Sequence, residues 1–172
     1  IRDSATPSGI YRNGAKRTID ILLIALALPF VLPVLAIMAG FVMMDGHSPF
    51  YRQERVGRGG RHFSLLKIRT MVPNAKEKLE EYLASDPAAR AEWDETQKLK
   101  TDPRITFAGR ILRKTSLDEL PQLWNVLKGD MSLIGPRPMM PEQRALYPGQ
   151  AYYELRPGIT GSWQVSDRNE GS

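Results

Sequence analysis

The longest apolar stretch of the sequence runs from residue 21 to residue 44, between Asp20 and Asp45, and its 24 residues include no charged side chain. As an α-helix it would extend about 36 Å, which is comparable with a bilayer hydrocarbon core of about 30 Å. Pro29 and Pro33 lie in its middle, where each lacks an amide hydrogen and crowds the carbonyl one turn earlier. The pattern therefore predicts a membrane-associated helix that is broken at Pro29 and bends near Pro33.

Basic residues flank this stretch on both sides. They are Arg12, Lys16 and Arg17 before it and Arg52, Arg55, Arg58 and Arg61 after it. Because basic flanks prefer the cytoplasmic side, a spanning helix would have to export one cluster. A re-entrant helix that enters, bends and returns keeps both clusters, including Arg12 and Arg58, on the cytoplasmic side. A spanning helix and the buried helix of a soluble protein stay open as alternatives, whereas the length of the stretch disfavours a cleaved signal peptide.

The positive charge of the chain is concentrated around the apolar stretch. Residues 1–70 hold 10 Lys and Arg against 4 Asp and Glu, whereas residues 71–172 hold 14 against 15. Basic residues that bracket an apolar segment favour contact with anionic lipid headgroups over contact with nucleic acid. A nucleic-acid-binding protein with an apolar anchor is a weaker alternative, because no aromatic residues are interleaved with the arginines.

Two further elements follow along the chain. Residues 50–56 and 62–69 predict a β-hairpin, with its turn at Gly57, Arg58, Gly59 and Gly60. In an extended second strand Lys67 and Arg69 lie on the same face, which is either solvated or used for binding. Residues 74–100 predict charged helical structure with a break at Asp86-Pro87 and no assigned chemistry.

The composition limits the chemistry that the chain can perform. With 172 residues, 42% of them hydrophobic and 25% charged, it suits one compact domain with a short appendage. The absence of cysteine excludes disulfides, thiolate zinc sites and a cysteine nucleophile. His47 and His62 are too few for a three-histidine metal site. Any metal ion is therefore expected to be a hard, oxygen-bound ion such as Mg²⁺.

Residues 101–138 contain the strongest candidate site. Ser116 and Glu119 match a capping box, which predicts a helix that starts at Ser116 and ends at Gly129. Asp118 and Glu119 can serve only the helix start, or they can hold Mg²⁺ beside a diphosphate. A carboxylate such as Asp118 can also attack phosphorus and form an acyl phosphate.

Cationic side chains near this pair are candidates for binding phosphate oxygens, because guanidinium groups donate paired hydrogen bonds. The candidates are Lys67, Arg69, Arg113, Lys114, Arg137 and Arg156. Arg137 lies between Pro136 and Pro138, whose fixed φ angles stiffen the loop and reduce the entropy lost on binding. The alternative for an arginine beside a proline is an ordinary surface loop.

From about Lys16 to Asn169, the chain closely resembles the bacterial sugar transferases that act as monotopic polyprenyl-phosphate phosphoglycosyl transferases. The motifs that carry this resemblance are Lys16-Arg17-Thr18-Ile19-Asp20, the proline-broken apolar helix, Lys67-Ile68-Arg69-Thr70-Met71, Asp102-Pro103-Arg104-Ile105-Thr106, Ser116-Leu117-Asp118-Glu119-Leu120-Pro121-Gln122, Lys128-Gly129-Asp130-Met131-Ser132, Gly135-Pro136-Arg137-Pro138 and Arg156-Pro157-Gly158-Ile159-Thr160-Gly161. One departure is Leu32 before Pro33, where relatives often have serine.

The resemblance implies a small α-rich α/β catalytic domain at the cytoplasmic face of the bacterial inner membrane, with a re-entrant helix in residues 1–48 and the catalytic part in residues 49–172. It implies transfer of a sugar 1-phosphate from a UDP-sugar to undecaprenyl phosphate with release of UMP, in exopolysaccharide or glycoconjugate assembly. Asp118 would be the nucleophile and Glu119 its partner in binding Mg²⁺. No nucleic acid is expected as a partner, and a homo-oligomer stays open.

Two alternatives to this covalent enzyme stay open. The first is a bitopic membrane protein whose basic cytosolic domain is a non-enzymatic assembly or lipid-binding module. The second keeps the enzyme but makes the transfer direct, in one ternary complex, with Asp118 serving only the metal ion. No motif selects among sugars.

Overall fold

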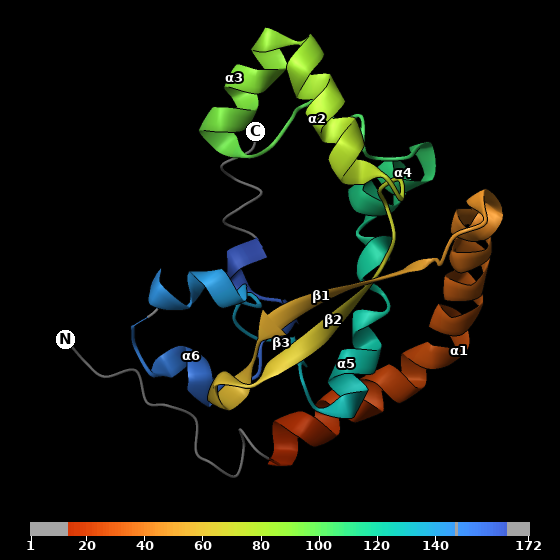
Figure 1. Ribbon diagram of the computed structural model, residues 1–172. Coiled ribbons are helices and arrows are strands. Elements are labelled where there is room, and N and C mark those ends of the chain that lie inside the picture. Colours follow the sequence, from red (N-terminus) through yellow and green to blue (C-terminus); the bar gives the residue numbers. More distant parts are fainter. Residues whose placement is uncertain (1–13, 147, 165–172) are drawn as a thin grey trace. The chain divides into compact units, whose positions relative to one another are not determined.

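The computed structural model describes residues 14–146 and 148–164, so that Arg12 lies outside the described part (Figure 1). The chain forms two compact units, each built from separate stretches of sequence. The first unit comprises Ile1–Ala36, Arg52–Lys67 and Glu119–Ser172, and the second comprises Ile37–Tyr51 and Ile68–Asp118. The predicted division into residues 1–48 and 49–172 stays a prediction.

The described residues are mostly helical, with two small sheets. In chain order the elements are α1 (Lys16–Val42), η2 (Met43–Asp45), β1 (Phe50–Val56), η3 (Arg58–Gly60), β2 (His62–Ile68), α2 (Ala75–Ser85), α3 (Pro87–Thr96), α4 (Phe107–Thr115), η4 (Leu117–Glu119), α5 (Gln122–Lys128), β3 (Ser132–Ile134), η5 (Pro141–Leu146), α6 (Ala151–Glu154) and β4 (Gly158–Thr160), where η marks a 3₁₀ helix. The predicted combination of helices with a short hairpin is confirmed.

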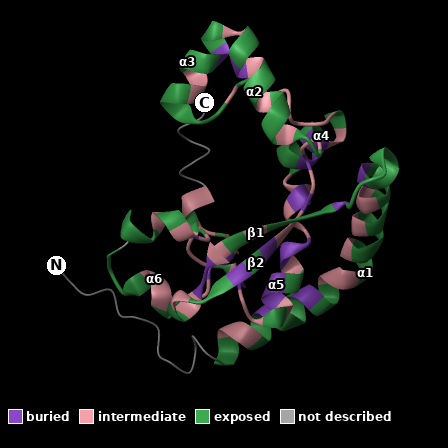
Figure 2. Cartoon of the chain, in the orientation of Figure 1, coloured by how far each residue is buried: buried purple, intermediate pink, exposed green. Residues whose placement is uncertain are grey.

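Helix α1 contains the whole apolar stretch except its last two residues, and it continues through Pro29 and Pro33. Figure 1 shows that the helix changes direction near its middle. Within the described residues it is the one helix that is long and apolar enough to cross a membrane. Its apolar side chains are largely exposed, as Figure 2 shows, and Phe30 is 77% exposed. Such a surface is typical of a helix that is surrounded by lipid.

The first turns of α1 are anchored in the first unit. Ile24 is 1% exposed and belongs to the hydrophobic core. The buried carboxylate of Asp20 accepts a hydrogen bond from Ser132, and Lys16 donates to the same hydroxyl. Arg17 donates to the carbonyl oxygens of Val126 and Leu127 at the end of α5. The charges at the start of α1 therefore have structural partners within the first unit.

Strands β1 and β2 form the predicted hairpin, with η3 as its turn. The Gly-Gly turn works because Gly59 and Gly60 both have positive φ angles, which other residues rarely adopt. The second sheet pairs β3 with β4 in parallel, with Ser132 opposite Gly158. The buried core of the first unit combines α1, β2, α5 and the residues around β3, and consists of Ile24, Phe63, Leu65, Val126 and Met131.

The second unit contains α2, α3 and α4. Asp86 ends α2 and caps α3 by accepting hydrogen bonds from Ala88 and Ala89, with Pro87 at the first helical position. The predicted break is therefore confirmed. The predicted helix start at Ser116 is wrong, because Ser116 adopts a left-handed conformation with φ of 58° and ends α4. Helix α5 starts at Gln122 instead, after Pro121.

Candidate functional site

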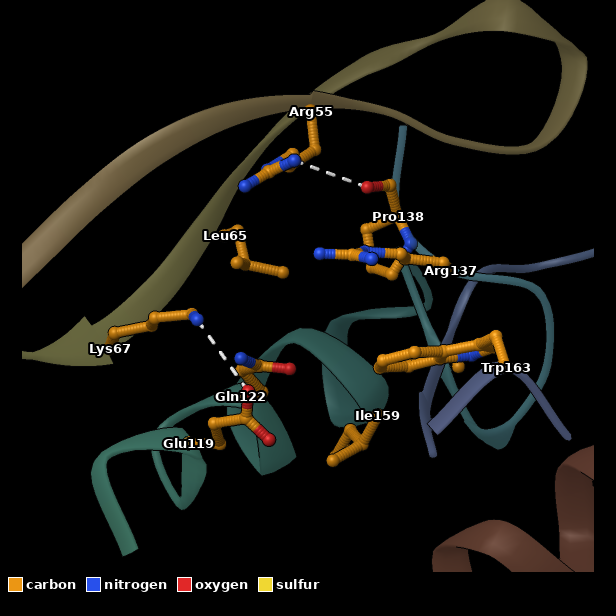
Figure 3. Close-up of a pocket in the computed structure, with 10 residues that line it drawn as sticks. Arg55, Leu65, Lys67, Glu119, Gln122, Arg137, Pro138, Ile159 and Trp163 are labelled. Carbon is orange, nitrogen blue, oxygen red and sulfur yellow. Dashed lines mark hydrogen bonds and ion pairs between the residues drawn. The ribbon is translucent and has the colours of Figure 1, made fainter. Parts of the chain in front are cut away.

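A small cavity of about 90 Å³ lies in the first unit, between the hairpin, the start of α5 and the segment around β4 (Figure 3). It is lined by Arg55, Leu65, Lys67, Glu119, Gln122, Arg137, Pro138, Gly158, Ile159 and Trp163. Lys67 Nζ lies 3.5 Å from Glu119 Oε1 and forms an ion pair with it. Three cationic side chains and one carboxylate therefore face one cavity, which is suited to a ligand that carries several negative charges.

Arg137 enters this cavity from the loop between β3 and η5. Its guanidinium carbon lies 5.5 Å from the centre of the Trp163 ring, in a cation–π arrangement. Trp163 is itself held by a hydrogen bond of 3.1 Å from its Nε1 to the carbonyl oxygen of Gly135. The neighbouring prolines and the indole ring thus restrict the Arg137 side chain before a ligand binds, which reduces the entropy lost on binding.

Arg55 and Gln122 line the cavity but were not among the site residues predicted from the sequence. Arg55 donates from Nη1 to the carbonyl oxygen of Pro138 at 3.2 Å and from Nη2 to Oε1 of Gln53 at 2.7 Å. Gln122 is 3% exposed, and Figure 3 shows its amide pointing into the cavity. The sequence signals were weak, because Arg55 is one of several arginines in the flank and Gln122 is the last residue of a motif in which only Asp118 and Glu119 were given a role.

Asp118 and Glu119 are consecutive in η4. Asp118 is 8% exposed and ends the second unit, while Glu119 begins a stretch of the first. Within residues 14–146 and 148–164 no group of three or more histidines and carboxylates could hold a metal ion. Mg²⁺ is usually bound by one or two carboxylates together with water and substrate phosphates, so that the donor chemistry of this pair fits the ion.

Two of the predicted phosphate ligands belong to the second unit and have structural partners there. Arg113 donates from Nε to the hydroxyl of the buried Thr70 at 2.8 Å. Arg69 forms a two-pronged ion pair with Asp45 at 2.7 and 2.8 Å. Its other donors bind the carbonyl oxygens of Val42, Ser48 and Met71. All five N–H groups of Arg69 are therefore used within the protein, which leaves none for phosphate.

Arg156 does not line the Glu119 cavity, and its Nε donates to the carbonyl oxygen of Gly129 at 3.1 Å. Partial burial lowers the pKa of Arg156 below its usual value, and the nearby positive charges of Arg58 and Arg17 lower it further. Of the six predicted phosphate ligands, the cavity thus brings together Lys67 and Arg137 with Glu119, while Arg156 borders a different cavity and Lys114 is exposed in the second unit.

Three curated relatives match most of the chain. The UDP-galactose-lipid carrier transferase of Erwinia amylovora is 55% identical over 159 residues, which are 91% of this chain and 33% of the relative. The exopolysaccharide production protein ExoY of Sinorhizobium fredii is 47% identical over 161 residues, covering 92% of this chain and 71% of the relative. The UDP-glucose:undecaprenyl-phosphate glucose-1-phosphate transferase of Caulobacter vibrioides is 38% identical over 163 residues, which cover 91% of this chain and 55% of the relative.

Each match covers about nine tenths of this chain but a smaller share of the relative. The chain spans about a third of the length of the Erwinia relative and a larger part of the other two. The family model described as "Bacterial sugar transferase" matches residues 11–172, which is nearly the whole chain. The resemblance inferred from the sequence motifs is confirmed, and the chain belongs to the bacterial sugar transferase family.

Proposed function

We propose that the chain is the catalytic part of an enzyme that transfers a sugar 1-phosphate from a UDP-sugar to a polyprenyl phosphate, giving a polyprenyl-diphosphate sugar and UMP. The observation that carries this proposal is the cavity in which Lys67, Arg55 and Arg137 surround Glu119. A UDP-sugar brings a diphosphate to such a cavity, and the names of two relatives contain a UDP-sugar donor.

The cationic side chains bind and orient the diphosphate. Arg137 offers a planar guanidinium that is already held against Trp163, and Lys67 supplies a point charge beside Glu119. Gln122 is a neutral donor and acceptor at the same cavity, where it suits a sugar hydroxyl better than a phosphate. Charge neutralisation by these groups lowers the repulsion between the donor and an attacking carboxylate.

The proposed chemistry uses Asp118 as the nucleophile. Its carboxylate oxygen attacks the sugar-bearing β-phosphorus, the bond from that phosphorus to the UMP oxygen breaks, and UMP leaves with the electron pair. A phosphate oxygen of the polyprenyl phosphate then attacks the phosphorus of the aspartyl phosphosugar and releases the Asp118 carboxylate. Neither step requires a proton transfer. Asp118 and Glu119 would hold Mg²⁺, which when bound neutralises charge on the diphosphate.

The covalent step can be tested by incubating the protein with UDP-sugar alone, stopping the reaction, and analysing the protein by mass spectrometry. A panel of donors that includes UDP-glucose and UDP-galactose is needed, since no motif selects the sugar. The wild type is expected to gain one phosphosugar on Asp118 and to release one equivalent of UMP. Asp118→Asn should abolish both, whereas Asp94→Asn, at an exposed carboxylate paired with Arg90 on α3, should leave them unchanged.

Kinetics separate this route from direct transfer. The covalent route predicts parallel lines in double-reciprocal plots as both substrates are varied, because UMP leaves before the acceptor reacts. Intersecting lines together with the absence of an adduct would establish direct transfer in a ternary complex. Absence of lipid-linked sugar with every donor, in the presence of Mg²⁺ and polyprenyl phosphate, would refute the enzymatic proposal and favour a non-enzymatic membrane module.

We also propose that α1 is a re-entrant helix at the cytoplasmic face of the bacterial inner membrane. The proposal rests on Pro29 and Pro33 inside the helix, on its exposed apolar side chains, and on the basic flanks at both ends. The anchoring of Lys16 and Arg17 on the first unit adds support, because Arg52–Lys67 belongs to that same compact unit. The described basic residues of both flanks thus belong to one compact unit, whereas Ile37–Tyr51 between them belongs to the other.

The chain contains no cysteine, so single cysteines report topology without background. Cysteines that replace Arg12 and Arg52 should both resist an impermeant thiol reagent in intact spheroplasts and react after lysis. Labelling of position 12 from outside, with position 52 protected, would establish a spanning helix instead. Pro33→Ala tests the cause, because unchanged topology in that variant would show that Pro33 does not determine the bend.

A further inference from the structure

A second and more basic cavity, of about 490 Å³, lies in the first unit beside the turn of the β-hairpin. It is lined by Gly57, Arg58, Gly59, Arg61, His62, Phe63, Lys128, Gly129, Asp130 and Arg156. Its single lining carboxylate, Asp130, lies 3.4 Å from Lys128 and forms an ion pair with it. His62 is paired with Glu54, at 2.7 Å. Three arginines thus remain as an excess of positive charge.

These three arginines have few partners within the described part of the chain. Arg58 and Arg61 make no side-chain hydrogen bond or ion pair to residues 14–146 and 148–164, and Arg156 uses only its Nε, toward Gly129. The terminal Nη groups of Arg156 are therefore available to a ligand. Keeping like charges close together without a counter-charge is unfavourable, and a bound anion relieves that repulsion.

This cavity is separate from the one that contains Glu119. The two share no lining residue. On β2, His62 borders the basic cavity and Lys67 borders the Glu119 cavity, and the five residue-to-residue steps of extended strand from one to the other span about 16 Å. The basic cavity is therefore not a second view of the catalytic site, and one diphosphate cannot bridge the two.

We propose that Arg58, Arg61 and Arg156 form an anion site that binds the phosphate group of an anionic phospholipid. Guanidinium groups match phosphate oxygens through paired hydrogen bonds, and the cavity volume lies within the range of ordinary ligand pockets. The lipid source follows from Arg17, which lies in the first turn of the apolar helix α1 and lines a further cavity together with Arg58 and Arg156. The site thus lies near the point where the chain enters the membrane, and it does not depend on the proposed reaction.

The test uses the full chain in a neutral detergent and follows lipid binding by native mass spectrometry. The probes are short-chain phosphatidylglycerol, phosphatidylcholine with the same chains, and inorganic pyrophosphate as the free anion. Arg58→Gln combined with Arg61→Gln should weaken phosphatidylglycerol binding at least about tenfold, because two charged donors are lost. The matched control is Arg52→Gln, which removes an exposed arginine of β1 that lines neither cavity.

Each outcome is decisive once circular dichroism shows that the variants are folded. Saturable binding of phosphatidylglycerol over phosphatidylcholine, lost in the double variant and kept in Arg52→Gln, supports the proposal. Binding of pyrophosphate alone would retain the anion site and overturn the lipid assignment. Equal lipid binding by the wild type and the double variant, or no preference for the anionic lipid, would show that the arginines are merely solvated.

Discussion

Asn125 connects α5 to the strand that carries Lys67, and its replacement should destabilise the first unit. The residue is 1% exposed. Its Nδ2 donates to the carbonyl oxygen of Ser64 at 2.7 Å, and its Oδ1 accepts from the backbone N–H of Leu66 at 3.0 Å. One amide side chain therefore satisfies a donor and an acceptor of β2 at the same time, which no apolar residue can do.

The expected loss follows from these two hydrogen bonds. In Asn125→Ala each bond contributes about 1 kcal/mol, and the unpaired N–H of Leu66 adds a desolvation penalty of about 1–2 kcal/mol, for a total of about 3 kcal/mol. For a chain of this size 1 kcal/mol corresponds to about 2–4 °C, so that the melting temperature should fall by about 6–12 °C. Transfer activity should fall with it, because Lys67 and Glu119 lose a fixed relative position.

Tryptophan fluorescence of the protein in nanodiscs measures this change in melting temperature. The matched control is Asn74→Ala, because Asn74 is exposed and its side chain makes no capping hydrogen bond to α2. Asn125→Asp adds a second measurement. Its carboxylate would face the Ser64 carbonyl near Asp130, so burial and repulsion raise its pKa, and stability should recover as the pH falls and the carboxyl becomes a donor. A melting temperature within 2 °C of the wild type in Asn125→Ala would refute the reasoning.

Three further changes test other parts of the structure. Arg137→Lys should lose most transfer activity while the protein stays folded, since lysine lacks paired donors, and full activity would return Arg137 to the role of a surface residue. Gly158→Ala should prevent stable folding, because its Cβ would clash with the backbone nitrogen of Gly135, whereas Gly149→Ala meets open space and should be neutral. Burial by itself would raise the pKa of Asp102, but the hydrogen bonds from Arg104 together outweigh burial and lower the pKa below 3.8. The stabilisation from this ionised carboxylate is therefore present above that pH and lost as the pH falls further. In Asp102→Asn the melting temperature should therefore fall less than in the wild type as the pH is lowered from about 5 into the acid range. An equal fall in both proteins would contradict this.

The elements that the sequence predicted well are those whose signals act over a few residues. The Gly59-Gly60 turn between residues 50–56 and 62–69 defined the hairpin, and Asp86-Pro87 marked the helix boundary through local capping. The helix predicted at Ser116 failed although its capping pattern was present. Pro121 was the competing local signal, because the residue before a proline avoids the helical conformation, and α5 begins only after it.

The candidate site was only partly predictable, because side-chain partners far apart in the sequence decide which charges remain for a ligand. Lys67 and Arg69 are separated by one residue, and a strand pattern assigns both to one face. The structure gives them different roles, since Lys67 lies in a cavity beside Glu119 whereas Arg69 is bound to Asp45 and to the last carbonyl of α1 at Val42. A cation at the C-terminal end of a helix is favoured by the helix dipole, and five donors in a planar fork satisfy acceptors that a lysine would leave unpaired. Arg69 therefore fixes the end of the apolar helix within the second unit, whereas Lys67, two residues earlier, lies in the cavity for which we propose a phosphate ligand.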